Sequence, residues 1–206
     1  MNIDGQIIEL SHLDKLFYPR DGITKGAVIE YYTTIAGVLL PFVAHRCISM
    51  QRFPHGIDGT SFYHKDIPAY FPDIVDRYQV PLVGEGDKTF NTLVVCNSRA
   101  TLVYLANQDV LTLHPWLSST SDIHRPDKLI FDLDPQDGSF AKVIEVALAL
   151  KAVLKSYDIK PFVMLTGSRG VHVVVPIVVE AEFAIVRAFV QKIAAEVVQK
   201  NLLYQL

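Results

Sequence analysis

Cysteine is scarce in this chain of 206 residues, which contains only Cys47 and Cys96. The two residues stand alone, with neither a C-x-x-C motif nor the Cys/His spacing of a zinc site. A disulfide framework and a zinc finger are therefore excluded as the features that organise the fold. We expect both thiols to be reduced and to lie in the core of an intracellular protein.

The chain also lacks an excess of basic residues, because 19 Lys and Arg stand against 22 Asp and Glu, for a formal net charge of −3. This balance excludes a surface coated with positive charge, so any contact with nucleic acid must be local. Uninterrupted apolar runs are much shorter than a membrane span, and the segment Met1–Gly5 has neither a basic nor an apolar leader region. We therefore expect a soluble, cytoplasmic protein that does not bind a membrane.

Hydrophobic residues make up 50% of the chain, which is enough for one well-buried domain over residues 1–206. Apolar residues at helical spacing predict helices at about 25–40, 98–108, 139–157 and 180–200, with Pro41 ending the first. Strands are predicted at 6–10, 47–53, 77–83, 92–96, 110–114, 161–166 and 171–176. The last two form an antiparallel hairpin, since only Gly167–Gly170 joins them. The fold class is α+β: a single domain with a mixed, largely antiparallel sheet flanked by helices.

Two aspartates, Asp132 and Asp134, follow the apolar run Lys128–Phe131, and Pro135 ends the strand that this run predicts. Alternation along a strand places both carboxylates on one face, where they repel each other unless a cation lies between them. Oxygen ligands at this spacing suit Mg²⁺ or Mn²⁺, the ions of phosphoryl and nucleotidyl transfer. A solvated strand end with an Asp-Pro turn is the alternative, and the pair alone does not decide between the two.

The predicted hairpin turn is the second informative feature. Two glycines flank Ser168 and Arg169, so the backbone can bend tightly and leave amides, a hydroxyl and a guanidinium to meet phosphate oxygens. An ordinary turn with an exposed arginine is the alternative. His172 lies on a strand otherwise made of valine, where its imidazole needs either a polar partner or a ligand. Together with the aspartates, these groups describe a site for a nucleoside triphosphate.

Further short motifs accompany this site in order along the chain. They are Asp14-Lys15, Phe17–Pro19, Gly22–Gly26, Arg52–Pro54, Gly56–Gly59, Phe62–Lys65, Thr101–Asn107, Leu113–Trp116, Phe131–Pro135 and Gly167–His172. Through them the chain resembles the polymerase domain of bacterial ligase D, a non-homologous end-joining enzyme of the archaeo-eukaryotic primase superfamily. The resemblance runs from about Ile8 to Gln199. Each motif is weak alone, whereas the ordered set is specific.

The resemblance implies roles residue by residue. Asp132 and Asp134 would be catalytic and hold the metal ions, Mn²⁺ or Mg²⁺. The nucleotide would be bound by Arg52, His114, Thr166, Ser168, Arg169 and His172. Lys15 and Lys25 would bind the 5′-phosphate of a downstream DNA strand, and Phe62 and Tyr63 would stack on template bases. The implied function is a DNA-repair nucleotidyltransferase that adds NTP or dNTP to primer 3′ ends at gaps or breaks. DNA ligase and an end-binding protein are the implied partners.

The sequence departs from the family pattern at three places. Met164 and Leu165 stand where the family usually has a lysine and a threonine, and Arg169 often aligns with a lysine. The family's third catalytic aspartate follows the last helix, and the sequence reaches Leu206 without it. The resemblance thus implies a C-terminally short domain that lacks the last strands, polymerises poorly and exposes a sheet edge.

Two other functions stay open. One is a catalytically impaired module that binds 5′-phosphorylated DNA ends, which the missing third aspartate favours. The other is a metal-dependent phosphohydrolase on an unrelated fold, which explains the two aspartates but not Lys15, Lys25 or Arg52. Without the resemblance, the lysines read as solvated surface charges, and Phe62 and Tyr63 read as core aromatics.

Overall fold

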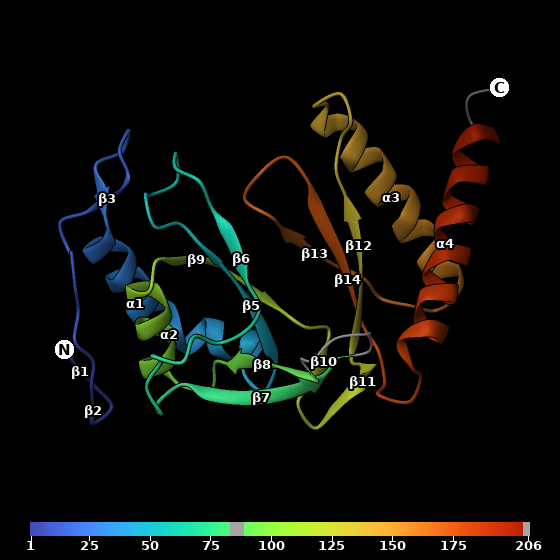
Figure 1. Cartoon of the computed structure of the whole chain (residues 1–206). Coiled ribbons are helices and arrows are strands. Elements are labelled where there is room, and N and C mark those ends of the chain that lie inside the picture. The colour runs from blue at the N-terminus through green and yellow to red at the C-terminus, as the bar shows by residue number, and fades with distance from the viewer. Residues whose placement is uncertain (83–88, 204–206) are drawn as a thin grey trace. The chain divides into compact units, whose positions relative to one another are not determined.

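Strand β5 (Cys47–Arg52) lies at the centre of the largest sheet in this computed structural model, which describes residues 1–82 and 89–203 (Figure 1). Every pairing in this five-stranded sheet is antiparallel. The other strands are β6 (Phe62–His64), β7 (Asp76–Pro81), β8 (Phe90–Val95) and β9 (Val110–Pro115). Along β5 the buried residues Cys47, Ile48 and Met50 face the core, and the strand ends at Arg52.

Two helices contribute to the same core. In α1 (Lys25–Val43) the hydroxyl of Thr24 accepts from the amide of Ala27, and in α2 (Arg99–Asn107) that of Ser98 accepts from Thr101. The prediction that Pro41 ends the first helix is wrong, because α1 runs through it to Val43. Proline lacks only its own amide proton, and the last turn still closes through the bond from the Ala44 amide to the Leu40 carbonyl.

Helix α1 also bears on the expectation that the chain does not enter a membrane. It has 19 residues and a mean hydropathy of 1.4, so by length and composition alone it is able to cross a bilayer. Its Val28, Ile29, Ala36 and Val43 are buried in the protein, which is equally typical of a helix that covers a core. The expectation therefore stays a prediction.

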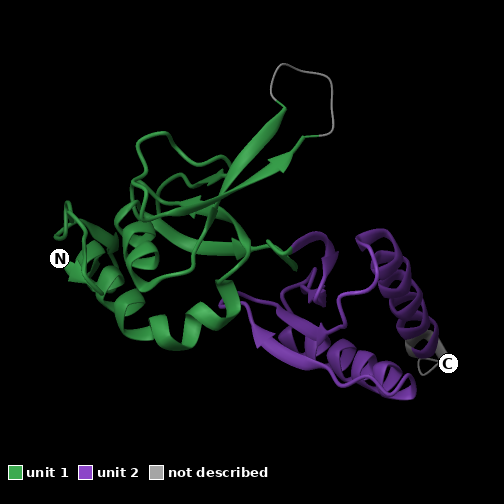
Figure 2. Cartoon of the chain, turned by 90° about the horizontal axis from the view of Figure 1, so that it is seen from below, with its two compact units in different colours: residues 1–121 green, residues 122–206 purple. Residues whose placement is uncertain are grey.

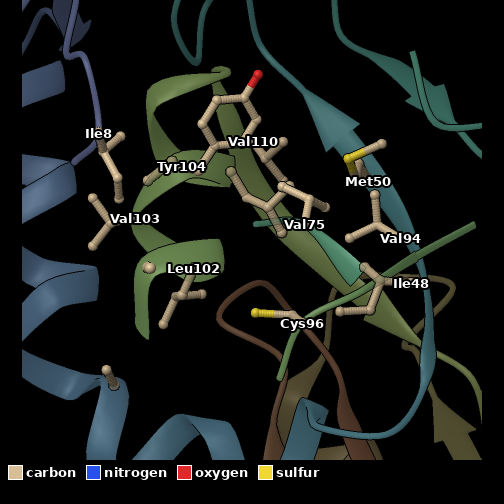
Figure 3. Close-up of a cluster of buried hydrophobic side chains, with 14 of the residues drawn as sticks. Ile8, Ile48, Met50, Val75, Val94, Cys96, Leu102, Val103, Tyr104 and Val110 are labelled. Carbon is tan, nitrogen blue, oxygen red and sulfur yellow. The ribbon is translucent and has the colours of Figure 1, made fainter. Parts of the chain in front are cut away.

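Figure 3 shows how this core is built from segments that are far apart in the sequence. Val103 of α2 lies next to Ile8 on one side of the cluster, and Ile48 and Val94 of the sheet lie on the other. Both cysteines are buried and free, as the sequence predicts. Tight packing here holds the ends of β5 and β9, which carry several of the predicted site residues.

A second, smaller sheet consists of three antiparallel strands in the order β12-β14-β13. These are β12 (Lys128–Leu133), β14 (Val171–Pro176) and β13 (Phe162–Leu165). Buried Leu129, Phe131, Val173 and Val175 pack against α3 (Phe140–Ser156) and α4 (Phe183–Leu203). All four residues of the outer strand β13 are exposed. The hairpin predicted across Gly167–Gly170 is confirmed.

The remaining strands are short. They are β1 (Asn2–Ile3), β2 (Gln6–Ile7), β3 (Leu16–Tyr18), β4 (Ile23–Thr24), β10 (Ser118–Ser119) and β11 (Asp122–Pro126). The chain divides into two compact units, 1–121 and 122–206 (Figure 2). The α+β class and the antiparallel pairing are confirmed, and the described strands are distributed over separate sheets. A single domain over residues 1–206 stays a prediction.

Candidate functional site

The predicted metal and nucleotide residues of unit 2 gather where β12 and β14 pair. Asp132 lies directly opposite His172 in the register, and His172 Nε2 is 3.3 Å from Asp132 Oδ1. The side chain of Asp132 is 62% exposed, because it alternates with the buried Phe131 on the other face of the strand. His172 Nδ1 is buried and has no hydrogen-bond partner among the described residues. The lone histidine on the valine strand is thus held by the first aspartate.

Asp134 comes one residue after the end of β12 and shares a shallow cavity with Asp132. The cavity has a volume of about 430 Å³, and Asp137, Lys142 and Val143 also line it. Lys142 forms an ion pair with Asp137, and this contact holds the pKa of the Asp137 carboxyl below its usual value. The two predicted metal ligands, by contrast, present their carboxylates to solvent.

The turn between β13 and β14 is folded against these carboxylates. A Cβ on Gly170 would lie 2.5 Å from the carbonyl oxygen of Leu133 and still closer to Asp134 Oδ1, so only glycine fits there. Gly167 has a positive φ of 80°, and the hydroxyl of Thr166 donates to the carbonyl of Gly170 over 3.0 Å. Ser168 and Arg169 are therefore exposed on a tight turn beside Asp134.

The donor set fits a hard divalent ion in part. Two exposed carboxylates on one cavity wall offer the oxygen ligands that Mg²⁺ and Mn²⁺ prefer. Within residues 1–82 and 89–203, however, no group of three or more His, Cys, Asp or Glu is placed to hold a metal ion. A metal ion bound here would complete its shell with water or with phosphate oxygens of a substrate, as Mg²⁺ usually does.

In unit 1, Lys15 and Lys25 meet at one carboxylate that the sequence analysis did not single out. Lys15 Nζ donates to Asp109 Oδ2 over 3.0 Å, and Lys25 Nζ lies 3.3 Å from Asp109 Oδ1. Lys25 is the first residue of α1 and is 3% exposed. Burial lowers the pKa of Lys25, and the nearby Asp109 opposes that shift. The reading of Lys25 as a solvated surface charge is therefore wrong.

Arg52, at the end of β5, is held by three neighbours. Its Nε donates to the Gln108 carbonyl over 2.9 Å, and its Nη1 donates to the Tyr70 hydroxyl over 3.0 Å. Its guanidinium also lies 5.9 Å from the centre of the Phe62 ring. The pairing of β5 with β9 shifts register at this point, which leaves Leu111 as a bulge whose carbonyl accepts from Tyr32. The bulge fixes the direction in which Arg52 leaves the strand.

The aromatic pair lies on the neighbouring strand β6. Phe62 and Tyr63 are 44% and 59% exposed, so the alternative that they are core aromatics is wrong. The ring of Tyr63 lies 5.2 Å from that of His114, whose Nε2 is 3.4 Å from Gln51 Oε1. Burial lowers the pKa of His114, which favours its neutral form. Successive residues of a strand point to opposite faces, so Tyr63 lies beside the neutral imidazole and Phe62 lies on the other face, near Arg52. Each exposed ring offers a flat face of the kind on which a base can stack.

The structure thus brings the predicted residues together within each unit. Unit 1 holds Lys15, Lys25, Arg52, Phe62, Tyr63 and His114, and unit 2 holds Asp132, Asp134, Thr166, Ser168, Arg169 and His172. Opposite His172 on β13 stands Met164, which with Leu165 is exposed and offers no charge or hydroxyl. Gln108 and Asp109 were missed, since their only signal was a polar turn after a helix, and Tyr70 was missed because it lies in the irregular segment between β6 and β7.

Comparisons with known proteins identify the family and the fold. The model of the family described as LigD, primase-polymerase domain, matches residues 24–202. A bifunctional non-homologous end joining protein LigD of Bacillus subtilis is 32% identical over 190 residues, 91% of this chain and 30% of that protein. A multifunctional LigD of Mycolicibacterium smegmatis is 29% identical, over 82% of this chain and 22% of its own length. The chain therefore spans less than a third of these relatives. Among solved structures, the polymerase domain of Mycobacterium tuberculosis ligase D in complex with DNA matches with a TM-score of 0.85 and 26% identity, over 95% of this chain and 70% of that one.

Proposed function

Because the chain belongs to the LigD primase-polymerase domain family, we propose that it is a nucleotidyltransferase that adds NTP or dNTP to primer 3′ ends at DNA gaps or breaks. The observation that carries this proposal is the register of β12 and β14. It sets Asp132 against His172 and folds the Gly167–Gly170 turn onto Asp134, so carboxylates and phosphate-binding groups lie side by side. DNA in the related solved structure supports a nucleic-acid substrate.

Each residue of unit 2 has a role in this reaction. Asp132 and Asp134 would hold Mn²⁺ or Mg²⁺, which would supply charge neutralisation at the phosphates and lower the pKa of the attacking hydroxyl. The exposed hydroxyl of Ser168 and guanidinium of Arg169 hold the triphosphate, and the tight turn limits their motion. His172, whose Nε2 lies 3.3 Å from Asp132 Oδ1, keeps that carboxylate oriented.

Unit 1 supplies the contacts to DNA and part of those to the nucleotide. The exposed Phe62 and Tyr63 stack on bases, His114 lies near the sugar, and Arg52 assists at the phosphates. Lys15 and Lys25 bind the 5′-phosphate of the downstream strand. With a net charge of −3, the affinity for DNA depends on these local cations and falls as salt rises.

The test is nucleotide addition on gapped DNA with Mn²⁺ and each nucleotide type, for the wild type, Asp132→Asn and the control Glu145→Gln. Glu145 is an exposed acid on α3, so both substitutions remove one carboxylate charge from the same unit. We expect the rate of nucleotide addition to fall in Asp132→Asn by more than roughly 10- to 100-fold. That range is the usual cost of removing a residue that only hydrogen-bonds to a metal ligand. Equal loss in the two variants would contradict a metal-binding role.

A second candidate function is an end-binding module with little catalysis of its own. It is favoured by the Lys15 and Lys25 cluster and by the absence of a third ligand among the described His, Cys, Asp and Glu. We infer for this reason that the 206-residue chain polymerises weakly when tested alone. Binding of 5′-phosphate DNA without extension, abolished in Lys25→Ala but not in Lys151→Ala, would establish this function instead.

The names of the relatives place them in non-homologous end joining. We propose the same cellular setting for this chain, with a cytoplasmic location and with DNA ligase and an end-binding protein as partners. Recovery of ligation on ends that need filling, when the chain is added to a ligase, is the expected result.

A further inference from the structure

Asp109 adopts a backbone conformation that disfavours an ordinary side chain. Its φ is 63°, in the left-handed region that glycine adopts readily and aspartate adopts only occasionally. The turn is also tied down, since the Asp109 carbonyl accepts from the Phe53 amide over 2.8 Å. The turn thus holds the carboxylate in one place, aimed at two lysines.

Both oxygens of this carboxylate are engaged by the lysines that the proposed function assigns to the 5′-phosphate. Oδ2 accepts from Lys15 and Oδ1 faces Lys25, and the side chains of Lys15, Lys25 and Asp109 are 26%, 4% and 16% exposed. Ser11 Oγ lies 3.5 Å from Lys25 Nζ on another side. An anion from outside therefore meets Lys25 only where Asp109 already stands.

We propose that Asp109 is a specificity-determining residue: a built-in carboxylate that occupies the anion position between Lys15 and Lys25 and competes there with the 5′-phosphate of DNA. This inference rests on the proposed role of the two lysines. The terminal phosphate takes over the ammonium groups of Lys15 and Lys25, and Asp109 is left beside it as a like charge. The carboxylate keeps the lysines ordered in the absence of DNA and weakens their hold on the end.

Asp109 affects phosphate binding in two opposite ways: it repels the phosphate, and it orders the lysines that bind it. The relative sizes of these two effects decide whether Asp109 weakens or strengthens binding. Two like charges about 4 Å apart near a protein surface change a binding constant by more than about a hundredfold. Burial already holds Lys25 in place, so ordering in advance applies mainly to the partly exposed Lys15 and changes the binding constant by about thirtyfold at most. Salt and side-chain movement reduce the first effect more than the second. Repulsion still outweighs ordering, so Asp109 weakens binding on balance.

The experiment measures the affinity of gapped DNA that bears either a 5′-phosphate or a 5′-hydroxyl, at two salt concentrations. The proteins are the wild type, Asp109→Asn, Asp109→Gly, Lys25→Ala and the control Asp21→Asn. Asp21 is an exposed acid close to Lys25 in sequence, so its substitution changes the net charge equally. Asp109→Gly also relieves the left-handed backbone, which guards against a folding defect in Asp109→Asn.

We expect Asp109→Asn and Asp109→Gly to bind phosphorylated DNA about tenfold more tightly, and hydroxyl-ended DNA within about twofold of the wild type. Asp21→Asn should leave the ratio of the two affinities unchanged. The inference is overturned if both Asp109 variants bind phosphorylated DNA no more tightly than the wild type does. If Lys25→Ala nevertheless abolishes the phosphate preference, the proposed function stands. No phosphate preference in the wild type or in either Asp109 variant overturns both.

Discussion

The two units treat their predicted site residues in opposite ways. In unit 1, Lys15 and Lys25 share Asp109, and Arg52 donates to Gln108 and Tyr70, so the cations already have partners. In unit 2, Asp132 is largely exposed with one imidazole beside it, and Ser168 and Arg169 are exposed on a turn. The cations Lys15, Lys25 and Arg52 of unit 1 are therefore tied into the fold, whereas the charged side chains of the turn and of Asp134 in unit 2 are left open to solvent.

This difference predicts which substitutions change both stability and activity and which change activity alone. A substitution at a paired cation of unit 1 removes contacts that hold segments together, so it changes both properties. A substitution at an exposed end of unit 2 removes a contact to a ligand and leaves the fold intact. An exception is the glycine that brings the turn against the carboxylates.

Gly170→Ala is expected to have the largest effect on stability. Its Cβ would meet the Leu133 carbonyl at 2.5 Å, so β12 and the turn must move apart, at a cost of about 3 kcal/mol. Hydrogen exchange should show lost protection in β12 and β14, and nucleotide addition should fall with it. Unchanged protection of both strands would mean that the turn adapts and that the close contact does not hold the site.

Raising the pH should weaken unit 1, which contains both cysteines. Burial raises the pKa of the Cys47 thiol from 9.0 to about 11 and raises that of Cys96 as well. Below pH 9 the folded and unfolded states are both protonated; above it the unfolded state loses its protons first, so stability falls between pH 9 and 11. For Cys47 alone the loss is about 2–3 kcal/mol.

Fluorescence of Trp116, the single tryptophan of the chain, reports this loss for unit 1. The comparison is with a variant that carries Cys47→Ala and Cys96→Ala. Lys25 and Tyr32 titrate in both proteins, so their contributions cancel in the difference. A pH slope that is the same in both proteins would show that the thiols are not its source.

Arg52→Ala and Arg169→Ala test the contrast between the units with one chemical change. Arg52→Ala removes bonds to Gln108 and Tyr70 and should destabilise the protein by about 2 kcal/mol. Arg169→Ala should leave thermal stability within about 0.5 kcal/mol and raise the KM for the nucleotide about tenfold. Melting curves together with kinetics check both. If Arg169→Ala destabilises as much as Arg52→Ala, the two units do not differ in this way.

The smallest expected effect is a gain. Gly37 lies inside α1, and a Cβ there would meet nothing within 4 Å. Gly37→Ala should therefore stabilise the helix by about 0.5–1 kcal/mol, because glycine loses more backbone entropy on folding. A calorimetric melt measures it. A loss would indicate that the helix needs glycine one turn before Pro41.

Local features of the fold were readable from the sequence. The helices predicted from about residues 25 and 98 are present, with Thr24 and Ser98 as their N-caps, and the short glycine-containing connection forms the β13–β14 hairpin. Such features depend on neighbours in sequence, where propensity and spacing act directly. Ser139 shows the limit, since it stands at the N-cap of α3 but makes no side-chain capping bond.

Contacts across long sequence distances were not readable. The ion pair of Lys15 with Asp109 joins residues that are 94 positions apart, and no pattern in the sequence predicts it. The exposure of Phe62 and Tyr63 likewise follows from tertiary packing, because they point to opposite faces of the edge strand β6 and neither side chain is buried there. Residue types predicted that Asp132 ends an apolar strand and that the glycines form a tight turn, whereas tertiary packing decides which charges are neutralised in advance.

Strand β5 shares one of its edges between two partners. It pairs with β8 at Cys47 and Ile48 and with β6 from Met50 to Arg52, while β9 follows its other edge from Ile48 to Arg52. Opening the three β6 pairs leaves those with β8 and β9 intact. Strand β6, which carries the exposed Phe62 and Tyr63, is therefore attached to the sheet by fewer pairs than the β5–β9 core, and we expect its amides to exchange before those of β5 and β9.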